Sequence, residues 1–214
     1  MANVTIKLGV LALAGPDNGG TYQYTLSMLQ ALSHTSGLEI TVYGDPQNPD
    51  FVKLGYPIRD FSESRWQQLA ALAAHRVHFK LRDRFASQDI LLAPIYSLAL
   101  LHTAKPFAYT LHDIQENYYP ENFSRWQRVG RYQVHAQLLG RAARVICESR
   151  YVKADIIRSF GVPEQQAVVI TAPPLRHPGA GLRQLQQSRK SSTDDFPDAV
   201  GSVDPTYGAS GCGH

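Results

Sequence analysis

The stretch that decides the fold reads Lys105-Pro-Phe-Ala-Tyr-Thr-Leu-His-Asp-Ile-Gln-Glu-Asn-Tyr-Tyr-Pro-Glu-Asn-Phe123. Residues 107–111 form a short aromatic, β-branched and aliphatic run after a proline, which is typical of a strand buried on both faces. The run ends at His112-Asp113. Ligands of open α/β sheets bind beyond the carboxyl ends of the strands, so this pair lies where such proteins carry out chemistry. The alternative is that Asp113 caps a turn and His112 is a hydrogen-bonded residue on the rim.

Apolar strands alternate with helical patterns on both sides of this stretch. We predict strands at residues 4–14, 38–43, 89–94, 107–111, 143–147 and 167–171. We predict helices at residues 21–34, from 64 onward, and at 97–102, 124–139 and 151–160. Right-handed crossovers join successive parallel strands, so the alternation predicts an α/β fold. Its core is a doubly wound, mostly parallel, Rossmann-like sheet of six or seven strands.

Helix ends are marked by local signals. The tetrapeptide Ser-Arg-Trp-Gln occurs at residues 64–67 and again at 124–127, each time with the spacing of a capping box. Ser149 is a suitable N-cap for the helix at 151–160, and Gly161 supplies a left-handed stop. We interpret the repeated tetrapeptide as two helices with the same capping requirement.

A glycine-containing loop, residues 15–20, follows the first strand and precedes the first helix. The adjacent Gly19 and Gly20 let the backbone approach a ligand closely, and the free N–H groups of the helix start make an anion site. A tight turn without a ligand explains the glycines equally well. The loop lacks the GxGxxG spacing of dinucleotide-binding proteins, and Tyr43-Gly44 stands where their acidic residue would follow the second strand.

Composition is that of a soluble globular protein, with 43% apolar and 18% charged residues. The formal charge of +3 is carried by scattered Arg and Lys residues, so nucleic-acid binding is not indicated. A mildly basic surface suits an anionic substrate or an anionic membrane face. No apolar run is long enough to span a bilayer, and the N-terminus does not resemble a signal peptide. The two cysteines form no metal or disulfide pattern, so we expect a cytoplasmic protein.

The character of the chain changes after residue 174. Residues 175–214 are rich in Pro, Gly, Ser, Gln and Asp without any period, which predicts a low-complexity, disordered tail behind one domain at residues 1–174. No metal site is expected, because His75 and His78 have no third ligand near them in sequence.

Three motifs carry a family resemblance: Thr-Leu-His-Asp-Ile-Gln from residue 110, Tyr-Pro-Glu-Asn-Phe-Ser from 119, and Arg-Val-Ile-Cys-Glu-Ser-Arg-Tyr-Val-Lys-Ala-Asp-Ile from 144. With their order, they make residues 4–174 resemble the N-terminal half of retaining GT-B glycosyltransferases of family 4, also called group 1. The resemblance stops there, so we expect the donor-binding half of that family to be missing from this chain.

The resemblance implies a hexosyl-type glycosyltransferase of polysaccharide biosynthesis. A nucleotide sugar would be the co-substrate, no metal or other cofactor would be needed, and a glycan or lipid-linked acceptor would receive the sugar with retention. Gly19 and Gly20 would close over the donor diphosphate. His112 would lie near the sugar and the phosphate, and Asp113 would orient it or its loop. We favour positioning over proton transfer for His112, because retaining enzymes of this fold often let the leaving phosphate take the acceptor proton.

Tyr22, Tyr118 and Tyr119 are the candidates for the acceptor side. The aromatic loop that contains the last two packs over the acceptor crevice or covers the edge of the domain, and the sequence does not choose between these. A peripheral contact with the inner membrane surface is a further expectation.

A different class of function stays open. The loss of resemblance after residue 174 also fits a truncated or frame-shifted product, which would be a catalytically incompetent acceptor-binding module.

Overall fold

The structure is a computed structural model in which residues 5–62, 64–77 and 81–171 are described. The predicted tail, the domain boundary at residue 174 and His78 lie outside these residues.

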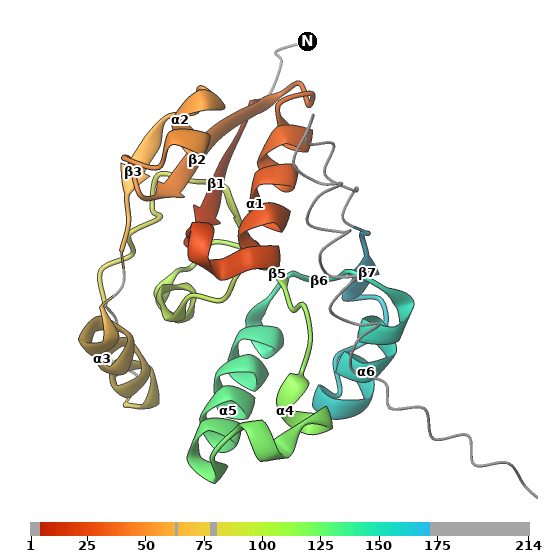
Figure 1. Cartoon of the computed structure of the whole chain (residues 1–214). Coiled ribbons are helices and arrows are strands. Elements are labelled where there is room, and N and C mark those ends of the chain that lie inside the picture. Colours follow the sequence, from red (N-terminus) through yellow and green to blue (C-terminus); the bar gives the residue numbers. More distant parts are fainter. Residues whose placement is uncertain (1–4, 63, 78–80, 172–214) are drawn as a thin grey trace, which may run out of the picture. The chain divides into compact units, whose positions relative to one another are not determined.

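A seven-stranded sheet, all of whose pairings are parallel, forms the centre of the described chain (Figure 1). Its strand order is β3-β2-β1-β4-β5-β6-β7. The chain therefore builds outward from β1 to β3, returns to the other side of β1, and continues to β7. This doubly wound order confirms the predicted α/β, Rossmann-like fold. The strands are β1 (Ile6–Ala12), β2 (Leu38–Gly44), β3 (Ile58–Asp60), β4 (Ile90–Ala93), β5 (Phe107–Thr110), β6 (Arg144–Cys147) and β7 (Ala167–Val169).

Helices connect the strands and cover the sheet (Figure 1). The α-helices are α1 (Gly19–Leu32), α2 (Pro49–Lys53), α3 (Arg65–Arg76), α4 (Gln115–Tyr118), α5 (Arg125–Arg141) and α6 (Arg150–Phe160). Three short 3-10 helices complete the set: η1 (Pro16–Asn18), η2 (Leu98–His102) and η3 (Pro120–Asn122).

The core has two layers, one on each face of the sheet. Successive strand residues point to opposite faces, and on β1 both Val10 and Leu11 are fully buried, Val10 in one hydrophobic cluster and Leu11 in the other. Residues of α1 and α2 pack into the cluster of Val10, whereas residues of α3, η2, α5 and α6 pack into that of Leu11. Burial on both faces explains why the strands read as continuous apolar runs.

The predicted helix caps are confirmed. Ser64 and Ser124 each accept a hydrogen bond from the backbone N–H three residues later, and the side chain of that Gln accepts from the Ser backbone N–H. Ser149 caps α6 by accepting from Val152 N. Gly161 ends α6 with φ of 66°, in the left-handed region that favours glycine.

The structure differs from the sequence prediction in the short elements. Residues 49–53 and 58–60 form α2 and β3, which we did not predict, because one turn of helix and three strand residues leave no readable period. The aromatic loop after His112 contains α4 and η3. Helix α1 begins at Gly19, so both glycines belong to its first turn.

A buried polar pair lies between β5 and α5. The hydroxyl of Tyr109 lies 2.9 Å from His135 Nδ1, and His135 is 3% exposed, with no hydrogen-bond partner for its Nε2 among the described residues. Burial lowers the pKa of His135 to about 4, so the ring is neutral at ordinary pH. Burial also raises the pKa of the fully buried Cys147 thiol on β6, to about 11. No helix of the described residues has the length and apolar character needed to cross a membrane.

Candidate active site

The strand order reverses between β1 and β4, and a crevice of about 420 Å³ opens at the carboxyl ends of the strands beside this point. Sheets of this kind bind ligands at such a switch point. The lining residues lie at or after the ends of β1, β2, β3 and β4, and they include Phe51 of α2 and Gln68 of α3: Ala12, Leu13, Ala14, Gly15, Pro16, Asp45, Asn48, Phe51, Phe61, Ser62, Gln68, Ile95 and Tyr96.

His112 lies beyond the carboxyl end of β5. In the sheet, β5 pairs with β4 on one side and with β6 on the other. His112 Nε2 donates to the backbone oxygen of Pro94 at 2.8 Å, because a carbonyl can only accept. Its Nδ1 lies 3.1 Å from Glu148 Oε1, in a contact that becomes an ion pair when the ring is protonated. Both ring nitrogens therefore face acceptors. The side chains of His112 and Glu148 stay partly exposed, at 23% and 34%.

Tyr24 of α1 connects the imidazole to the glycine turn. Its ring meets His112 edge to face, with 5.0 Å between the centroids. Gly20 precedes Tyr24 by one helical turn, a rise of about 6 Å. The structure thus brings the start of α1 and His112 to the same edge of the sheet. Burial raises the pKa of Tyr24, so its hydroxyl stays protonated at this edge.

Gly19 and Gly20 face open space, since a Cβ built on either would meet no atom within 4 Å. Gly19 has φ of 51° and donates its N–H to Pro16 O, so its own conformation explains why it is glycine. Gly20 has no such requirement. Its N–H and that of Thr21 belong to the turn that a helix leaves without intrahelical partners. Packing within the described chain does not account for Gly20.

Asp113 holds its own loop and does not contact His112, whose carboxylate partner is Glu148. The Asp113 carboxylate accepts from the backbone and side-chain N–H groups of Gln115, at 3.4 and 3.1 Å. It therefore holds the start of α4. Glu148, at the end of the adjacent strand β6, is the carboxylate that contacts His112. Its place at a strand end was visible in the sequence, but the pairing of β5 with β6 was not.

The three tyrosines of the predicted acceptor side are not brought together. Tyr22 is 3% exposed, and its hydroxyl donates to Asn48 or to Asp50 of α2, at 3.0 and 2.8 Å. Tyr118 is the last residue of α4, and its hydroxyl accepts from Arg158 of α6 at 3.4 Å. Tyr118 and its neighbour Tyr119 are 42% and 58% exposed. None of the three lines the crevice.

Metal ligands do not gather at this edge. Among residues 5–62, 64–77 and 81–171, no group of three or more His, Cys, Asp or Glu side chains is placed to hold a metal ion.

Two solved structures have a similar fold. The crystal structure of Anabaena Alr3699/HepE in complex with UDP and glucose is 18% identical, with a TM-score of 0.50 over 85% of this chain and 50% of that chain. The S. aureus MnaA-UDP co-structure is 13% identical, with a TM-score of 0.52 over 77% of this chain and 43% of that one. The described chain thus matches about half the length of each. No curated protein matches the sequence.

The family model for Glycosyltransferase Family 4 matches residues 18–172, which is more than half of the chain. The matched region contains α1, the strand end at His112 and the β6-α6 segment that contains Glu148, so it contains both sides of the contact described above. With the GT-B-like order of its sheet, this match identifies the chain as a member of Glycosyltransferase Family 4.

Proposed function

We propose that the chain forms the acceptor-side half of a glycosyltransferase. It would transfer a hexosyl group from a nucleotide sugar to a glycan or lipid-linked acceptor in polysaccharide biosynthesis, with retention at the anomeric carbon. The observation that supports this most directly is the contact between Tyr24 and His112, which joins the glycine turn and the imidazole at one edge.

The donor diphosphate would bind at the start of α1. Sugar transfer leaves charge on the departing diphosphate, and amides at a helix start stabilise such charge. Gly20 adds open space in which a phosphate can approach the backbone. The fold neighbours named above contain UDP, which makes a uridine nucleotide the first donor to test.

His112 would position the donor. Both of its nitrogens already face acceptors, so a phosphate or sugar oxygen reaches Nδ1 only by replacing Glu148. The partial exposure of Glu148 allows its side chain to turn away. The Nε2–H bond to Pro94 would hold the ring in place during the exchange. Asp113 acts indirectly, by fixing the loop through Gln115.

The acceptor would enter the crevice of about 420 Å³ beside the switch point. Asp45, Ser62, Gln68 and Tyr96 supply polar groups there for sugar hydroxyls. Tyr22 is buried and its hydroxyl already bonds to Asn48 or Asp50, so we do not assign it to the acceptor. Tyr118 and Tyr119 stay candidates for a more distant part of the acceptor.

A peripheral contact with the inner face of the cytoplasmic membrane would bring a lipid-linked acceptor within reach. The first two turns of α5 support it, because Arg125, Trp126 and Arg128 are exposed there and Trp126 is 83% exposed. Residues 122–130 contain both of these arginines and no acidic residue. Exposed tryptophan beside arginine is the pattern of a surface that lies on anionic lipid.

Titration calorimetry with a panel of nucleotide sugars, led by UDP-glucose, tests the proposal. We expect heat of binding with the unchanged chain and a loss of at least about tenfold in affinity for His112→Ala. The exposed His34, changed to Ala, is the matched control and should bind normally. Absence of heat with every nucleotide sugar would refute the donor role. Product formation, followed with labelled sugar, distinguishes an enzyme from a binding module.

A further inference from the structure

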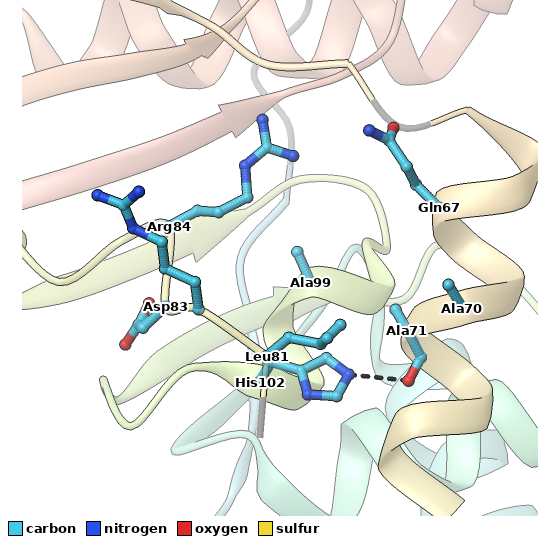
Figure 2. Close-up of a pocket in the computed structure, with 9 residues that line it drawn as sticks. Gln67, Ala70, Ala71, Leu81, Asp83, Arg84, Ala99 and His102 are labelled. Carbon is cyan, nitrogen blue, oxygen red and sulfur yellow. Dashed lines mark hydrogen bonds between the residues drawn. The ribbon is translucent and has the colours of Figure 1, made fainter. Parts of the chain in front are cut away.

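A second cavity, of about 640 Å³, lies between α3, residues 81–84 and η2 (Figure 2). It is larger than the crevice at the strand ends, and the site described above does not use it. Its walls are Gln67, Ala70, Ala71, Leu81, Arg82, Asp83, Arg84, Ala99 and His102.

Small side chains leave this space unfilled, and one hydrogen bond fixes the two elements that border it. Ala70 and Ala71 of α3 face Ala99 of η2 across it, and none of the three extends beyond its Cβ. His102 Nε2 donates to Ala71 O at 2.8 Å, which ties η2 to α3 (Figure 2). The volume is within the range of small-molecule sites in proteins.

The charged groups of the cavity are predominantly positive. Neither Arg82 nor Arg84 forms an ion pair with any of residues 5–62, 64–77 and 81–171. The Asp83 carboxylate between them accepts from Phe85 N, Thr103 Oγ1 and Ala104 N, at 2.8, 2.9 and 3.3 Å. Its oxygens are thus committed to its own loop and to the segment after η2, whereas neither guanidinium group donates a hydrogen bond to a residue of the described ranges, so their donors can serve a ligand.

Arg84 also connects the cavity to the candidate active site. Its guanidinium carbon lies 3.9 Å from the centroid of the Phe61 ring, and Phe61 lines the crevice at the strand ends. Stacking on the ring restricts the guanidinium, so less freedom is lost when it binds an anion. Gln67 and Gln68, neighbours on α3, line the cavity and the crevice respectively. The two spaces therefore adjoin.

We propose that this cavity binds the anionic group of an acidic sugar, a uronate carboxylate or a sugar phosphate, and that the acceptor is an acidic glycan. The inference rests on the proposed function for its acceptor role. Two guanidinium groups offer the paired donors that carboxylate and phosphate oxygens accept. Gln67 and His102 add polar groups for the neighbouring hydroxyls.

Titration calorimetry with glucuronate, glucose 6-phosphate, glucose and inorganic phosphate tests the inference. We expect at least one acidic sugar to bind, glucose not to bind, and inorganic phosphate to bind more weakly than the sugar phosphate. Arg82→Gln and Arg84→Gln should each lower the affinity for the acidic sugar about tenfold. Arg84→Lys should be intermediate, because it keeps the charge and loses the planar fork. The exposed Arg144, changed to Gln, is the matched control.

The donor site separates the two proposals. Gly20→Ala should weaken the binding of UDP-glucose and leave the binding of the acidic sugar unchanged. Arg84→Gln should weaken the binding of the acidic sugar and leave that of UDP-glucose unchanged. Unchanged acidic-sugar binding in the Arg82→Gln, Arg84→Gln double variant would overturn the inference, as would absence of acidic-sugar binding to a chain that binds UDP-glucose. Acidic-sugar binding without nucleotide binding would keep the anion site and refute the donor role.

Discussion

The rings of Tyr24 and His112 meet edge to face, with interplanar angle 88° and 5.0 Å between their centroids. This contact joins helix α1 to the end of β5. It also means that changes at the helix start, at the imidazole and at its partner Glu148 report on one site.

Glu148→Gln should strengthen UDP-glucose binding about threefold. In our proposal the Glu148 carboxylate occupies the position on His112 that a phosphate oxygen takes, and removing its charge weakens this competition. Calorimetry at constant ionic strength measures the effect. Glu164→Gln, at an 81% exposed carboxylate, is the control. Weaker binding by Glu148→Gln would show that the carboxylate helps to hold the ligand.

Gly20→Ala should stabilise the folded chain and weaken the binding of the nucleotide-sugar donor. The added methyl group meets no atom within 4 Å, and alanine within a helix is about 0.5–1 kcal/mol more favourable than glycine. The same methyl group would occupy the space next to the proposed diphosphate. Urea unfolding and UDP-glucose titration measure the two effects. Gly130→Ala in α5 should give the stability gain alone, so equal donor binding in both variants would contradict the donor site.

Asn48→Ala should lower the free energy of unfolding by about 2–3 kcal/mol. The Asn48 side chain accepts from Asp50 N and Phe51 N at the start of α2 and lies 3.0 Å from the Tyr22 hydroxyl, so its loss removes a cap and a buried partner. Tyr22→Phe should cost about 1 kcal/mol. A double-mutant cycle by urea unfolding measures the coupling between the two side chains, and zero coupling would contradict a structural role for Tyr22.

Stability should fall as the pH is lowered from about 6.5 to 4, in part because of His135. The folded ring has a pKa of about 4 and is mostly neutral until the pH approaches 4, whereas the unfolded ring takes up a proton below its ordinary pKa of 6.5. The unfolded state therefore binds more protons, and the folded state loses up to about 3 kcal/mol.

Urea unfolding at several pH values measures this loss. The double variant Tyr109→Phe, His135→Phe removes both partners of the buried pair and should unfold with a correspondingly smaller pH dependence. An identical pH profile in the variant would assign the acid sensitivity to other groups.

Trp126→Ala should reduce binding to vesicles of phosphatidylglycerol and phosphatidylcholine, because Trp126 exposes most of its ring beside Arg125 and Arg128. Arg128→Gln should weaken binding about fivefold, since one basic residue near an anionic surface contributes about 1 kcal/mol. Co-sedimentation measures both, with Arg144→Gln as the control. Binding that persists at high salt and without Trp126 would contradict this surface.

The sequence predicted the local features of the fold well. The capping boxes at Ser64 and Ser124 and the stop at Gly161 are confirmed, because each is written in a few adjacent residues. The apolar runs predicted the strands, since burial on both faces leaves no polar alternation. Helix α2 and strand β3 escaped prediction because tertiary contacts, such as the packing of Phe51 in the core, hold them in place.

The site was less predictable, because it depends on contacts far apart in sequence. His112 meets Tyr24, Pro94 and Glu148, and each contact follows from the strand order or from the crossover of α1. Asp113 adjoins His112 in sequence yet contacts Gln115. Tyr22 shares the helical face of core residues, and the helical period gave no means to separate it from a ligand-binding tyrosine.

The burial of Cys147 gives the protein an internal reporter. Its sulfur is buried on β6, between β5 and the edge strand β7, with a thiol pKa near 11, so a thiol reagent reaches it only when strands β5 to β7 separate. In a Cys212→Ser background, the rate at which such a reagent labels the chain therefore counts openings of the sheet itself. A sugar or nucleotide that binds only the closed form would lower this labelling rate, and the decrease would grow with its affinity and concentration.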